Sequence, residues 1–428
     1  MVAKDIWKRN WGGGNMEWKC YKIDELIDEI SMGPFGSDVK KEFYVKKGVP
    51  ILNGSNLQGF KLQEDSFGYL TEEKAKTLKK CIAQKGDIIV THRGTLGQIV
   101  YVPKNSKYDK YVISQSQFRF RCKKDLVDVP YLVYYFHTRE GQHKILANAS
   151  QVGVPALARA TSTFRRIEIC LPPLAIQRRI ASILSSLDRK IELNNKINAD
   201  LEEMAQAIFK NWFVDFEPFK DGKFVDSELG MIPEGWKVGS LGDMGTIVCG
   251  KTPSKANSNY YGGDIPFIKI PDMHGKVFVE SSEDRLTEQG SLSQIKKLIP
   301  PYSLMVSCIA TVGLVSINTK PSHTNQQINT IIPHNKSALF YLYQYIKNNE
   351  ELLKNMGRGG TTTLNVNTKS FSNIRLFIPS DIALLQFHQI VEGLFKKIEL
   401  NMQESRTLSL LRDTLLPRLM SGELEIPE

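Results

Sequence analysis

The sequence has few of the features from which catalytic or metal-binding sites are usually built. Its six cysteines are scattered singly, with no C-x-x-C pair and no Cys/His cluster, which indicates neither a zinc site nor a disulfide framework. The seven histidines have no ligand spacing, and neither an Asn-Pro-Pro-aromatic tetrapeptide nor a glycine fingerprint for a methyl donor occurs. These absences predict a chain with no catalytic residues, no metal and no cofactor of its own. Unpaired cysteines also favour a reducing cytoplasm.

Long apolar segments are absent as well. No run of about 18 apolar residues occurs, so no membrane partner is expected. Residues 1–15 lack the apolar core of a signal peptide, which again favours the cytoplasm. We interpret residues 1–17, which contain the glycine-rich stretch 11–15, as a flexible N-terminal extension.

Length and charge leave several classes of protein open. The chain has 428 residues, whereas single hydrophobic cores seldom grow beyond roughly 250–300 residues, so two or more cores are expected. Hydrophobic content of 41% and charged content of 24% are ordinary for a globular protein. The net charge of +10 is compatible with a nucleic-acid partner, but equally with a merely basic protein.

The most informative feature is an internal repeat. Residues 157–213 align with residues 364–420 at one constant offset without a gap, and residues 190–194 match 397–401 letter for letter. Upstream the repeat continues less evenly, and the side chains differ more. A period of about half the chain predicts two copies of one domain and a pseudo-two-fold molecule.

The repeat divides the chain into six parts. The predicted fold is mixed α/β, with two pseudo-repeated α/β domains separated by two long antiparallel coiled-coil helices. Short β-like runs at 88–90, 99–102 and 118–120 and a helix at 130–143 are expected in the first domain. The predicted parts are the extension 1–17, domain 1 at 18–173, long helix 1 at 174–214, a linker at 215–235, domain 2 at 236–379, and long helix 2 with the tail at 380–428.

Both long helices carry apolar residues at alternating spacings of four and three, which is typical of a coiled-coil seam. The first helix has no Gly or Pro between residues 174 and 213 and can span about 60 Å. Pro417 is expected to end or kink the second. The predicted seam consists of Leu184, Leu187, Ile191, Asn194, Leu201 and Ile208 in helix 1 and Val391, Leu394, Ile398, Asn401, Leu408 and Leu415 in helix 2.

Asn194 and Asn401 interrupt the two seams at the same place. Polar residues in a seam can fix helix register at a cost in stability. Alternatively, the two amides lie at the edge of the seam and are simply solvated. Both interpretations remain open from the sequence.

One motif is misleading. Residues 245–252 match the phosphate-binding pattern G-x-x-x-x-G-K-[ST], but Pro253 and a polar stretch follow where a helix should begin. We therefore expect no nucleotide site. Lys251 and Lys255 are instead candidate DNA phosphate contacts, with solvated surface lysines as the alternative.

Sequence-specific DNA recognition needs Arg, Lys, Asn or Gln at base edges and Ser, Thr or backbone N–H groups at phosphates. Polar turns that follow or precede β-like runs provide such residues in each copy. Loop capping and solvated charge are the alternatives. The DNA-binding candidates are Lys40, Lys41, Arg93, Thr95, Ser114, Gln115, Ser116, Gln117 and Arg119 in the first copy and Lys251, Lys255, Thr311, Asn325, Gln326, Gln327, Arg358 and Thr361 in the second.

Several stretches resemble one known family. Residues 208–216 (IFKNWFVDF) followed by 230–236 (GMIPEGW) look like the central region of a Type I restriction–modification specificity subunit. Residues 415–424 (LLPRLMSGEL) look like its C-terminal signature. Residues 250–254 (GKTPS), with YYGGDIPF ten residues on, and 33–37 (GPFGS) resemble the opening of its target-recognition domains.

The resemblance implies a non-catalytic subunit that binds double-stranded DNA. Each domain would read one half of an asymmetric, interrupted site, and the helices would set the spacing and dock two methyltransferase subunits. A motor-nuclease restriction subunit would join through these. S-adenosylmethionine and ATP are expected only on partner subunits. An enzyme acting alone and a stand-alone DNA-binding regulator are the alternatives.

Overall fold

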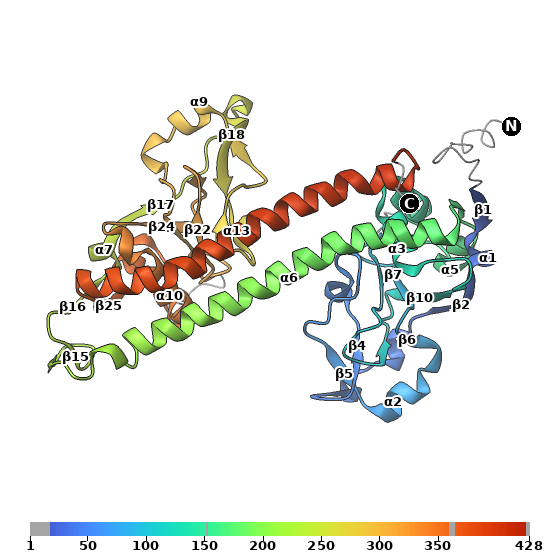
Figure 1. The fold of residues 1–428 in the computed structure, drawn as a ribbon, viewed down its shortest axis with the longest axis horizontal. Coiled ribbons are helices and arrows are strands. Elements are labelled where there is room, and N and C mark those ends of the chain that lie inside the picture. Colours follow the sequence, from blue (N-terminus) through green and yellow to red (C-terminus); the bar gives the residue numbers. More distant parts are fainter. Residues whose placement is uncertain (1–17, 151–152, 359–363, 425–428) are drawn as a thin grey trace. The chain divides into compact units, whose positions relative to one another are not determined.

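The computed structural model describes residues 18–150, 153–358 and 364–424, so the predicted extension 1–17 lies outside the described residues. The chain divides into two compact units, whose elements are labelled in Figure 1. Unit 1 comprises Met1–Ile191 and Thr407–Glu428, and unit 2 comprises Glu192–Arg406. Each unit therefore contains one α/β domain and a segment of each long helix.

Unit 1 is built on a four-stranded antiparallel sheet in the order β2-β10-β7-β8. Its strands are β2 (Ile27–Met32), β10 (Gln117–Cys122), β7 (Ile88–Thr91) and β8 (Ile99–Tyr101), which confirms the three strands predicted in this region. A second sheet has the order β3-β5-β4-β9-β6 and consists of β3 (Tyr44–Val45), β5 (Gly68–Leu70), β4 (Val49–Ile51), β9 (Lys110–Val112) and β6 (Ile82–Gln84). The small helices of these connections are α1 (Ile23–Leu26), η1 (Gly36–Asp38), η2 (Lys41–Phe43), η3 (Gly54–Leu57), α2 (Glu72–Thr77) and η4 (Lys79–Cys81).

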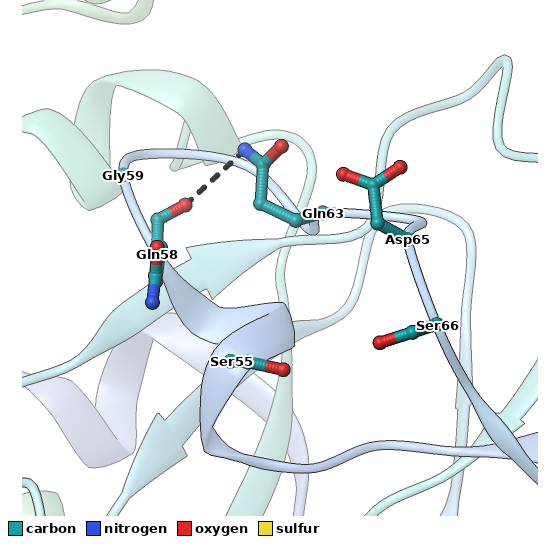
Figure 2. A pocket seen from close by; sticks show the side chains of 6 residues that line it. All are labelled: Ser55, Gln58, Gly59, Gln63, Asp65 and Ser66. Carbon is teal, nitrogen blue, oxygen red and sulfur yellow. Dashed lines mark hydrogen bonds between the residues drawn. The ribbon is translucent and has the colours of Figure 1, made fainter. Parts of the chain in front are cut away.

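The turn η3 and the loop that follows it enclose a polar hollow of about 500 Å³ (Figure 2). Asn56, which is 1% exposed, pins this loop by donating from Nδ2 to the carbonyls of Gln63 and Asp65. Ser55, Gln58 and Ser66 contribute further polar groups to the hollow.

The predicted helix at 130–143 is two helices in the structure: α3 (Val129–His137) and α4 (Arg139–Leu146). Thr138 separates them because its backbone is extended and its hydroxyl accepts from the Gly141 N–H, which caps α4. Asp128 caps α3 in the same way, with Pro130 in its first turn. A short hairpin, β11 (Ala149–Ser150) with β12 (Ala156–Leu157), and α5 (Ala160–Arg165) complete the domain.

Strands β1 (Lys19–Lys22) and β13 (Glu168–Leu171) pair antiparallel at the base of unit 1. The pairing places Cys20 opposite Cys170, and the two form a disulfide across 150 residues of sequence. The prediction of unpaired cysteines is therefore wrong for these two. Their distance in sequence concealed a pairing that the strand register creates.

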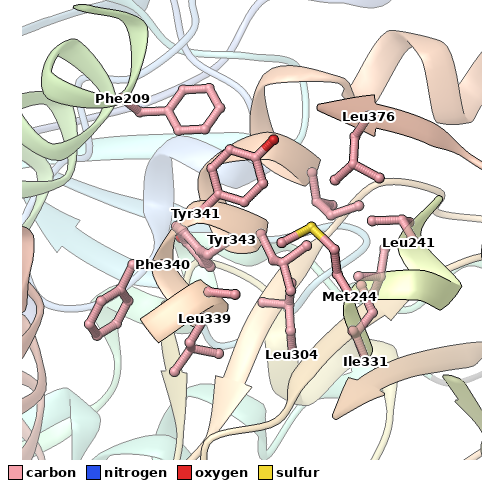
Figure 3. Close-up of a cluster of buried hydrophobic side chains, with 14 of the residues drawn as sticks. Phe209, Leu241, Met244, Leu304, Ile331, Leu339, Phe340, Tyr341, Tyr343 and Leu376 are labelled. Carbon is pink, nitrogen blue, oxygen red and sulfur yellow. The ribbon is translucent and has the colours of Figure 1, made fainter. Parts of the chain in front are cut away.

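Unit 2 repeats this plan with a larger main sheet, in the order β17-β24-β21-β22-β19. Figure 3 shows the core beneath it, where Leu304 and Ile331 from the sheet pack near Leu339 and Tyr341 of a helix. The strands are β16 (Lys237–Ser240), β17 (Gly245–Cys249), β18 (Tyr261–Ile268), β19 (Phe278–Val279), β20 (Arg285–Leu286), β21 (Leu304–Ser307), β22 (Val315–Asn318), β23 (His323–Thr324), β24 (Ile328–Pro333) and β25 (Arg375–Ile378). The helices are α7 (Leu241–Met244), η6 (Ser258–Tyr260), α8 (Ile270–Met273), α9 (Glu288–Leu292), η7 (Ile295–Lys297), η8 (Lys336–Ala338), α10 (Leu339–Asn348), α11 (Glu350–Gly357) and α12 (Thr368–Ser372).

The two long helices are confirmed as α6 (Leu174–Phe213) and α13 (Asp381–Met420), each of 40 residues. Between α6 and β16 the chain forms η5 (Glu217–Phe219) and the short pair β14 (Phe224–Val225) and β15 (Ile232–Pro233). Pro417 does not end α13, because the helix runs on to Met420 and the Ser421 N–H still bonds to the Pro417 carbonyl.

The helix segments pack antiparallel inside each unit. In unit 1, Asp188 of α6 bonds to Arg412 of α13 at 2.7 Å, and Leu184 shares a buried core with Leu416 and Leu419. In unit 2, Asn194 lies beside Asn401, and Phe213 of α6 contacts Phe387 of α13 with ring centroids 4.9 Å apart. All twelve predicted seam residues are buried or half-buried.

Asn194 and Asn401 are not solvated edge residues. They are 0% and 1% exposed. Asn194 Nδ2 donates to Glu404 at 2.9 Å and to Ser405 at 3.2 Å, and Asn401 Nδ2 donates to Asn198 at 2.9 Å. The alternative of a solvated edge is therefore wrong.

No helix among the described residues is long and apolar enough to span a membrane.

Candidate nucleic-acid interface

In unit 1, three loops meet at one edge of the main sheet. Strand β10 is antiparallel to both β2 and β7, so the ends of those strands lie beside the start of β10. Backbone hydrogen bonds join the loops: the Gly33 N–H donates to Gln117 O at 2.8 Å, and the His92 N–H donates to Ser116 O at 2.9 Å. The loops at 33–38, 92–98 and 113–117 thus form one continuous rim.

Unit 2 has the same rim at the same edge. Strand β24 is antiparallel to β17 and β21. The Gly250 N–H donates to Ile328 O at 3.1 Å, and the Cys308 N–H donates to Gln327 O at 2.8 Å. Each of the two hydrogen bonds in unit 1 therefore has a counterpart in unit 2.

A fourth segment closes each rim. In unit 1 the Leu157 N–H donates to His92 O, and the Gly94 N–H donates to Pro155 O, both at 2.8 Å. In unit 2 the matching bonds run to Cys308 O at 2.8 Å and from the Ala310 N–H to Leu364 O at 3.0 Å. Most candidates of each copy are thereby brought together, although 59 residues separate Gly33 from His92 (92 − 33) and 58 separate Gly250 from Cys308 (308 − 250).

One glycine in each unit makes the rim possible. A Cβ atom at Gly33 would lie 1.9 Å from the Ser114 carbonyl oxygen, and one at Gly250 would lie 2.2 Å from that of Asn325. Any larger residue would force the two loops apart. Sequence reasoning noted both glycines only as parts of motifs.

These contacts also correct the alignment of the two copies. By sequence alone, the polar cluster Ser114-Gln115-Ser116-Gln117 pairs roughly with Thr324-Asn325-Gln326-Gln327. The hydrogen bonds instead match Ser116 with Gln327 and Gln117 with Ile328, one residue further on. Gln115 therefore corresponds to Gln326.

Most unit 1 candidates lie on the rim with their side chains accessible. Arg93, Thr95 and Gln115 are exposed, and Ser114 and Ser116 are half-buried. His92 lies between them, with Nε2 3.1 Å from Gln115 O. Burial lowers the pKa of His92, so the neutral imidazole is favoured at neutral pH.

Two unit 1 candidates are internal. Arg119 is 3% exposed and bonds to Glu29 at 2.6 Å, with Asp87 3.6 Å away. Hydrogen bonding to this guanidinium lowers the pKa of Glu29. Gln117 is 1% exposed, and its amide bonds to Ser114 N and Asn53 O. Gln117 thus holds the rim loop 113–117, whereas Arg119 ties β10 to Glu29 of β2. Neither side chain is exposed, which corrects the expectation of direct DNA contact.

The two lysines of domain 1 lie apart from the rim itself. Lys40 and Lys41 are exposed at η2, in the connection from β2 to β3. They add positive charge to the chain segment that leaves the rim.

In unit 2, Lys251, Lys255, Thr311 and Gln326 are exposed, and Gln327 is half-buried. The Thr252 hydroxyl donates to Gln326 Oε1 at 2.7 Å. Arg358 is exposed at the end of α11, adjoining the rim because the Asn365 N–H bonds to Gly357 O. Asn325, by contrast, is 9% exposed and bonds to Gln327, which makes it a loop-holding residue. Thr361 lies outside the described residues.

Two neighbouring features refine the site. Lys251 follows strand β17 in a loop, and the next helical turn, η6, begins only at Ser258, so no helix N-terminus faces residues 250–252. Ala310 adopts φ +63° where unit 1 has Gly94 at φ +90°, so the unit 2 rim holds a strained backbone. Among the described residues, no group of three or more His, Cys, Asp or Glu is placed to hold a metal ion.

Residues 15–203 and 233–409 match the family described as Type I restriction modification DNA specificity domain. The chain belongs to this family. It is 33% identical to the Type I restriction enzyme HindI specificity subunit of Haemophilus influenzae, over 95% of this chain and all of that one. It is 29% identical to the MjaIX specificity subunit of Methanocaldococcus jannaschii, over 96% and 94% of the two chains.

The fold agrees with this membership. The crystal structure of the S subunit from M. genitalium superimposes with a TM-score of 0.58 and 17% identity, covering 95% of this chain and 97% of that chain. The chain is thus a specificity subunit of a Type I restriction–modification system, the DNA-recognition component that works together with other subunits. The predicted family and fold class are confirmed.

Proposed function

We propose that each rim reads one half of an asymmetric DNA site interrupted by a gap of unspecified sequence. The observation that carries this proposal is the pairing of one backbone frame with two sets of side chains. The backbone hydrogen bonds place Arg93 and Ser116 of unit 1 at positions equivalent to Ile309 and Gln327 of unit 2. Arg recognises guanine through O6 and N7, whereas an apolar side chain can only contact a thymine methyl or a sugar.

The other rim residues fit two further roles. Gln115 and Gln326 can make paired hydrogen bonds with adenine, worth about 1–3 kcal/mol of discrimination each. Contacts with phosphate oxygens position a protein on DNA without reading its sequence. The residues suited to such contacts are Lys40, Lys41, Thr95, Lys251, Lys255, Thr311 and Arg358. Binding should weaken steeply with salt, because each neutralised phosphate releases counterions.

The long helices are proposed to connect the readers, to set the gap and to dock two methyltransferase subunits, through which a motor-nuclease subunit joins. Exposed apolar side chains on both helices, such as Met204, Ile382 and Leu410, support a protein partner here. In this proposal the chain is not an enzyme and acts in the cytoplasm. S-adenosylmethionine and ATP would be bound by the partner subunits.

Selection of bound fragments from random DNA tests the proposal. The chain is co-expressed with a Type I methyltransferase subunit, and Arg93→Ala is compared with Thr311→Ala. We expect a two-part site in which Arg93→Ala relaxes one half only and Thr311→Ala weakens binding without relaxing that half. A single continuous motif, or the same loss in both halves, would contradict the proposal. Full specific binding by the isolated chain would instead favour a stand-alone regulator.

A further inference from the structure

Phe35 is the most exposed large hydrophobic side chain among the described residues, at 81%. It lies in the rim loop of unit 1, directly after the buried Pro34. Burial of a phenylalanine side chain is strongly favourable, so an aromatic ring left in water gives up a large stabilisation. Isolated exposed apolar residues are common, and exposure alone assigns no role.

The position of Phe35 separates it from such ordinary residues. The preceding Gly33 is bonded to Gln117, and a Cβ at the following Gly36 would lie 2.5 Å from Gln115 Oε1. Phe35 is therefore flanked on both sides by residues that touch the β10 loop. That loop carries Gln115, and it also bonds to the loop that carries Arg93. The ring thus projects from the rim that we assign to DNA.

The backbone at Phe35 is firmly held. Its N–H donates to Asp38 Oδ2 at 3.0 Å, and its carbonyl accepts from the Asp38 N–H at 2.9 Å. These two bonds close the single turn η1 around the residue. An aromatic ring on a fixed base loses little conformational entropy when it is inserted into a partner.

Unit 2 has no such ring. Counting from the matched glycines Gly33 and Gly250, the residue equivalent to Phe35 is Thr252. Thr252 is half-buried, and its hydroxyl donates to Gln326 Oε1. The two rims therefore differ in shape as well as in hydrogen-bonding groups.

We propose that Phe35 inserts its ring between two base pairs of the half-site bound by unit 1 and partly unstacks them. This inference rests on the proposed function. Proteins that deform DNA use apolar wedges of this kind next to polar groups that hold the backbone. The wedge favours pyrimidine–purine steps, which unstack most easily, so it adds specificity at a step that no hydrogen bond reads. Unit 2 binds its half-site without unstacking.

The test uses the specificity subunit in complex with its methyltransferase subunits and duplexes in which 2-aminopurine replaces one adenine at a time. Unstacking raises the fluorescence of this base. Apart from the adenine that a methyltransferase subunit flips out of the helix in each half-site, we expect a rise at one step of the unit 1 half-site and none in the unit 2 half-site. Phe35→Ala should abolish this Phe35-dependent rise and weaken specific binding about tenfold, as expected for the loss of one aromatic stacking contact. Phe35→Trp should retain both.

Leu292→Ala is the matched control, because Leu292 is also exposed, at 61%, but belongs to α9 of unit 2. It should change neither signal. If the wild-type complex binds no specific DNA, the proposed function itself fails. If it binds specifically but Phe35→Ala binds equally well, or shows the same fluorescence, the wedge is wrong. Weaker assembly of Phe35→Ala with the methyltransferase in the absence of DNA would also overturn it, since the ring would then contact protein.

Discussion

Unit 1 and unit 2 share one backbone framework but stabilise it with different side chains. Both hold three loops against the edge of a sheet with the same backbone bonds, but the base of unit 1 is closed by Cys20–Cys170 where strands β16 and β25 of unit 2 place Val238 opposite Phe377. Backbone bonds do not depend on side-chain identity, so they tie the loops without restricting what the tips carry. Such a frame can change its target without changing its fold.

The packing of the helices shows the same freedom. Asp188 and Arg412 form an ion pair in unit 1, and each is 17% exposed. At the repeat positions unit 2 has Phe395 and Ala205, both fully buried in its core. Unit 2 places its own ion pair elsewhere, where Glu202 bonds to Lys347 and Tyr343. The repeats conserve the number of such polar ties better than their positions.

The largest effect is expected from adding a side chain at the glycine where two rim loops touch in each unit. Gly33→Ala brings a methyl group into the Ser114 carbonyl, and Gly250→Ala does the same at Asn325. We expect each to destabilise its own unit by about 3 kcal/mol, the cost of severe overpacking. DNA selection should show each variant losing only one half of the site. Loss of the same half by both would break the equivalence of the rims. Gly54→Ala, where the added Cβ meets only Gln98 Oε1 at 3.7 Å, is a control for glycine replacement itself.

The next effect concerns His323, which unit 1 replaces by Val112 at the equivalent parallel bridge. His323 is 0% exposed, and burial lowers its pKa to about 4. A group whose pKa falls on folding contributes stability above its unfolded pKa of about 6.5, and this is lost as the pH falls towards 4. Unit 2 should therefore lose about 3 kcal/mol over that interval.

Urea unfolding between pH 7 and pH 4 measures this loss. The variant His323→Val places in unit 2 the residue type that unit 1 has at the equivalent position, Val112. The variant should lack the component of acid sensitivity that His323 contributes, while the response of unit 1 stays unchanged. An identical pH dependence in wild type and variant would show that His323 does not titrate on unfolding.

A smaller effect is expected at the ion pair of unit 1. Asp188→Asn leaves the mostly buried Arg412 without its main partner and should cost about 2 kcal/mol. The double variant Asp188→Phe with Arg412→Ala reproduces the unit 2 residues and should recover most of this loss, because apolar residues often replace buried ion pairs without penalty. Thermal unfolding distinguishes the two. Equal losses of stability in both variants would mean that the core of unit 1 cannot accommodate the Phe and Ala side chains that unit 2 has at these positions.

The smallest effect is expected at the buried asparagines. Asn401→Leu removes the partner of Asn198 and should cost about 1 kcal/mol. The pair Asn194→Leu with Asn401→Leu should be at least as stable as wild type, because the Asn194 Oδ1 atom already lacks a hydrogen-bond partner among the described residues. We expect the doubly substituted protein to accept a wider range of gap lengths, because the polar layer no longer selects one register. Binding to sites with the gap altered by one base pair measures this.

Much of this architecture was predictable, because periodicity and repetition are local properties of the sequence. The heptad spacing located both long helices, β-branched runs located β7 and β8, and the alternation of Phe and Arg at residues 118–121 located β10. The roles of Arg119 and Gln117 were not predictable in the same way. Both residue types suit DNA contact, and only the central position of β10 in its sheet shows that their side chains point inward. The one-residue error between the rims arose because only the backbone bonds define that register.

The division of the chain into units has a consequence for how the protein is made. Unit 2 is formed by a single uninterrupted stretch, Glu192–Arg406, whereas the core of unit 1 includes Leu416, Leu419 and Met420 from the far end of α13. On the ribosome, the domain translated first must therefore wait for the last segment to emerge, while the domain translated second can complete its core earlier. The core of unit 1 is thus completed after that of unit 2, and removal of residues 416–420 would expose the apolar surface of unit 1.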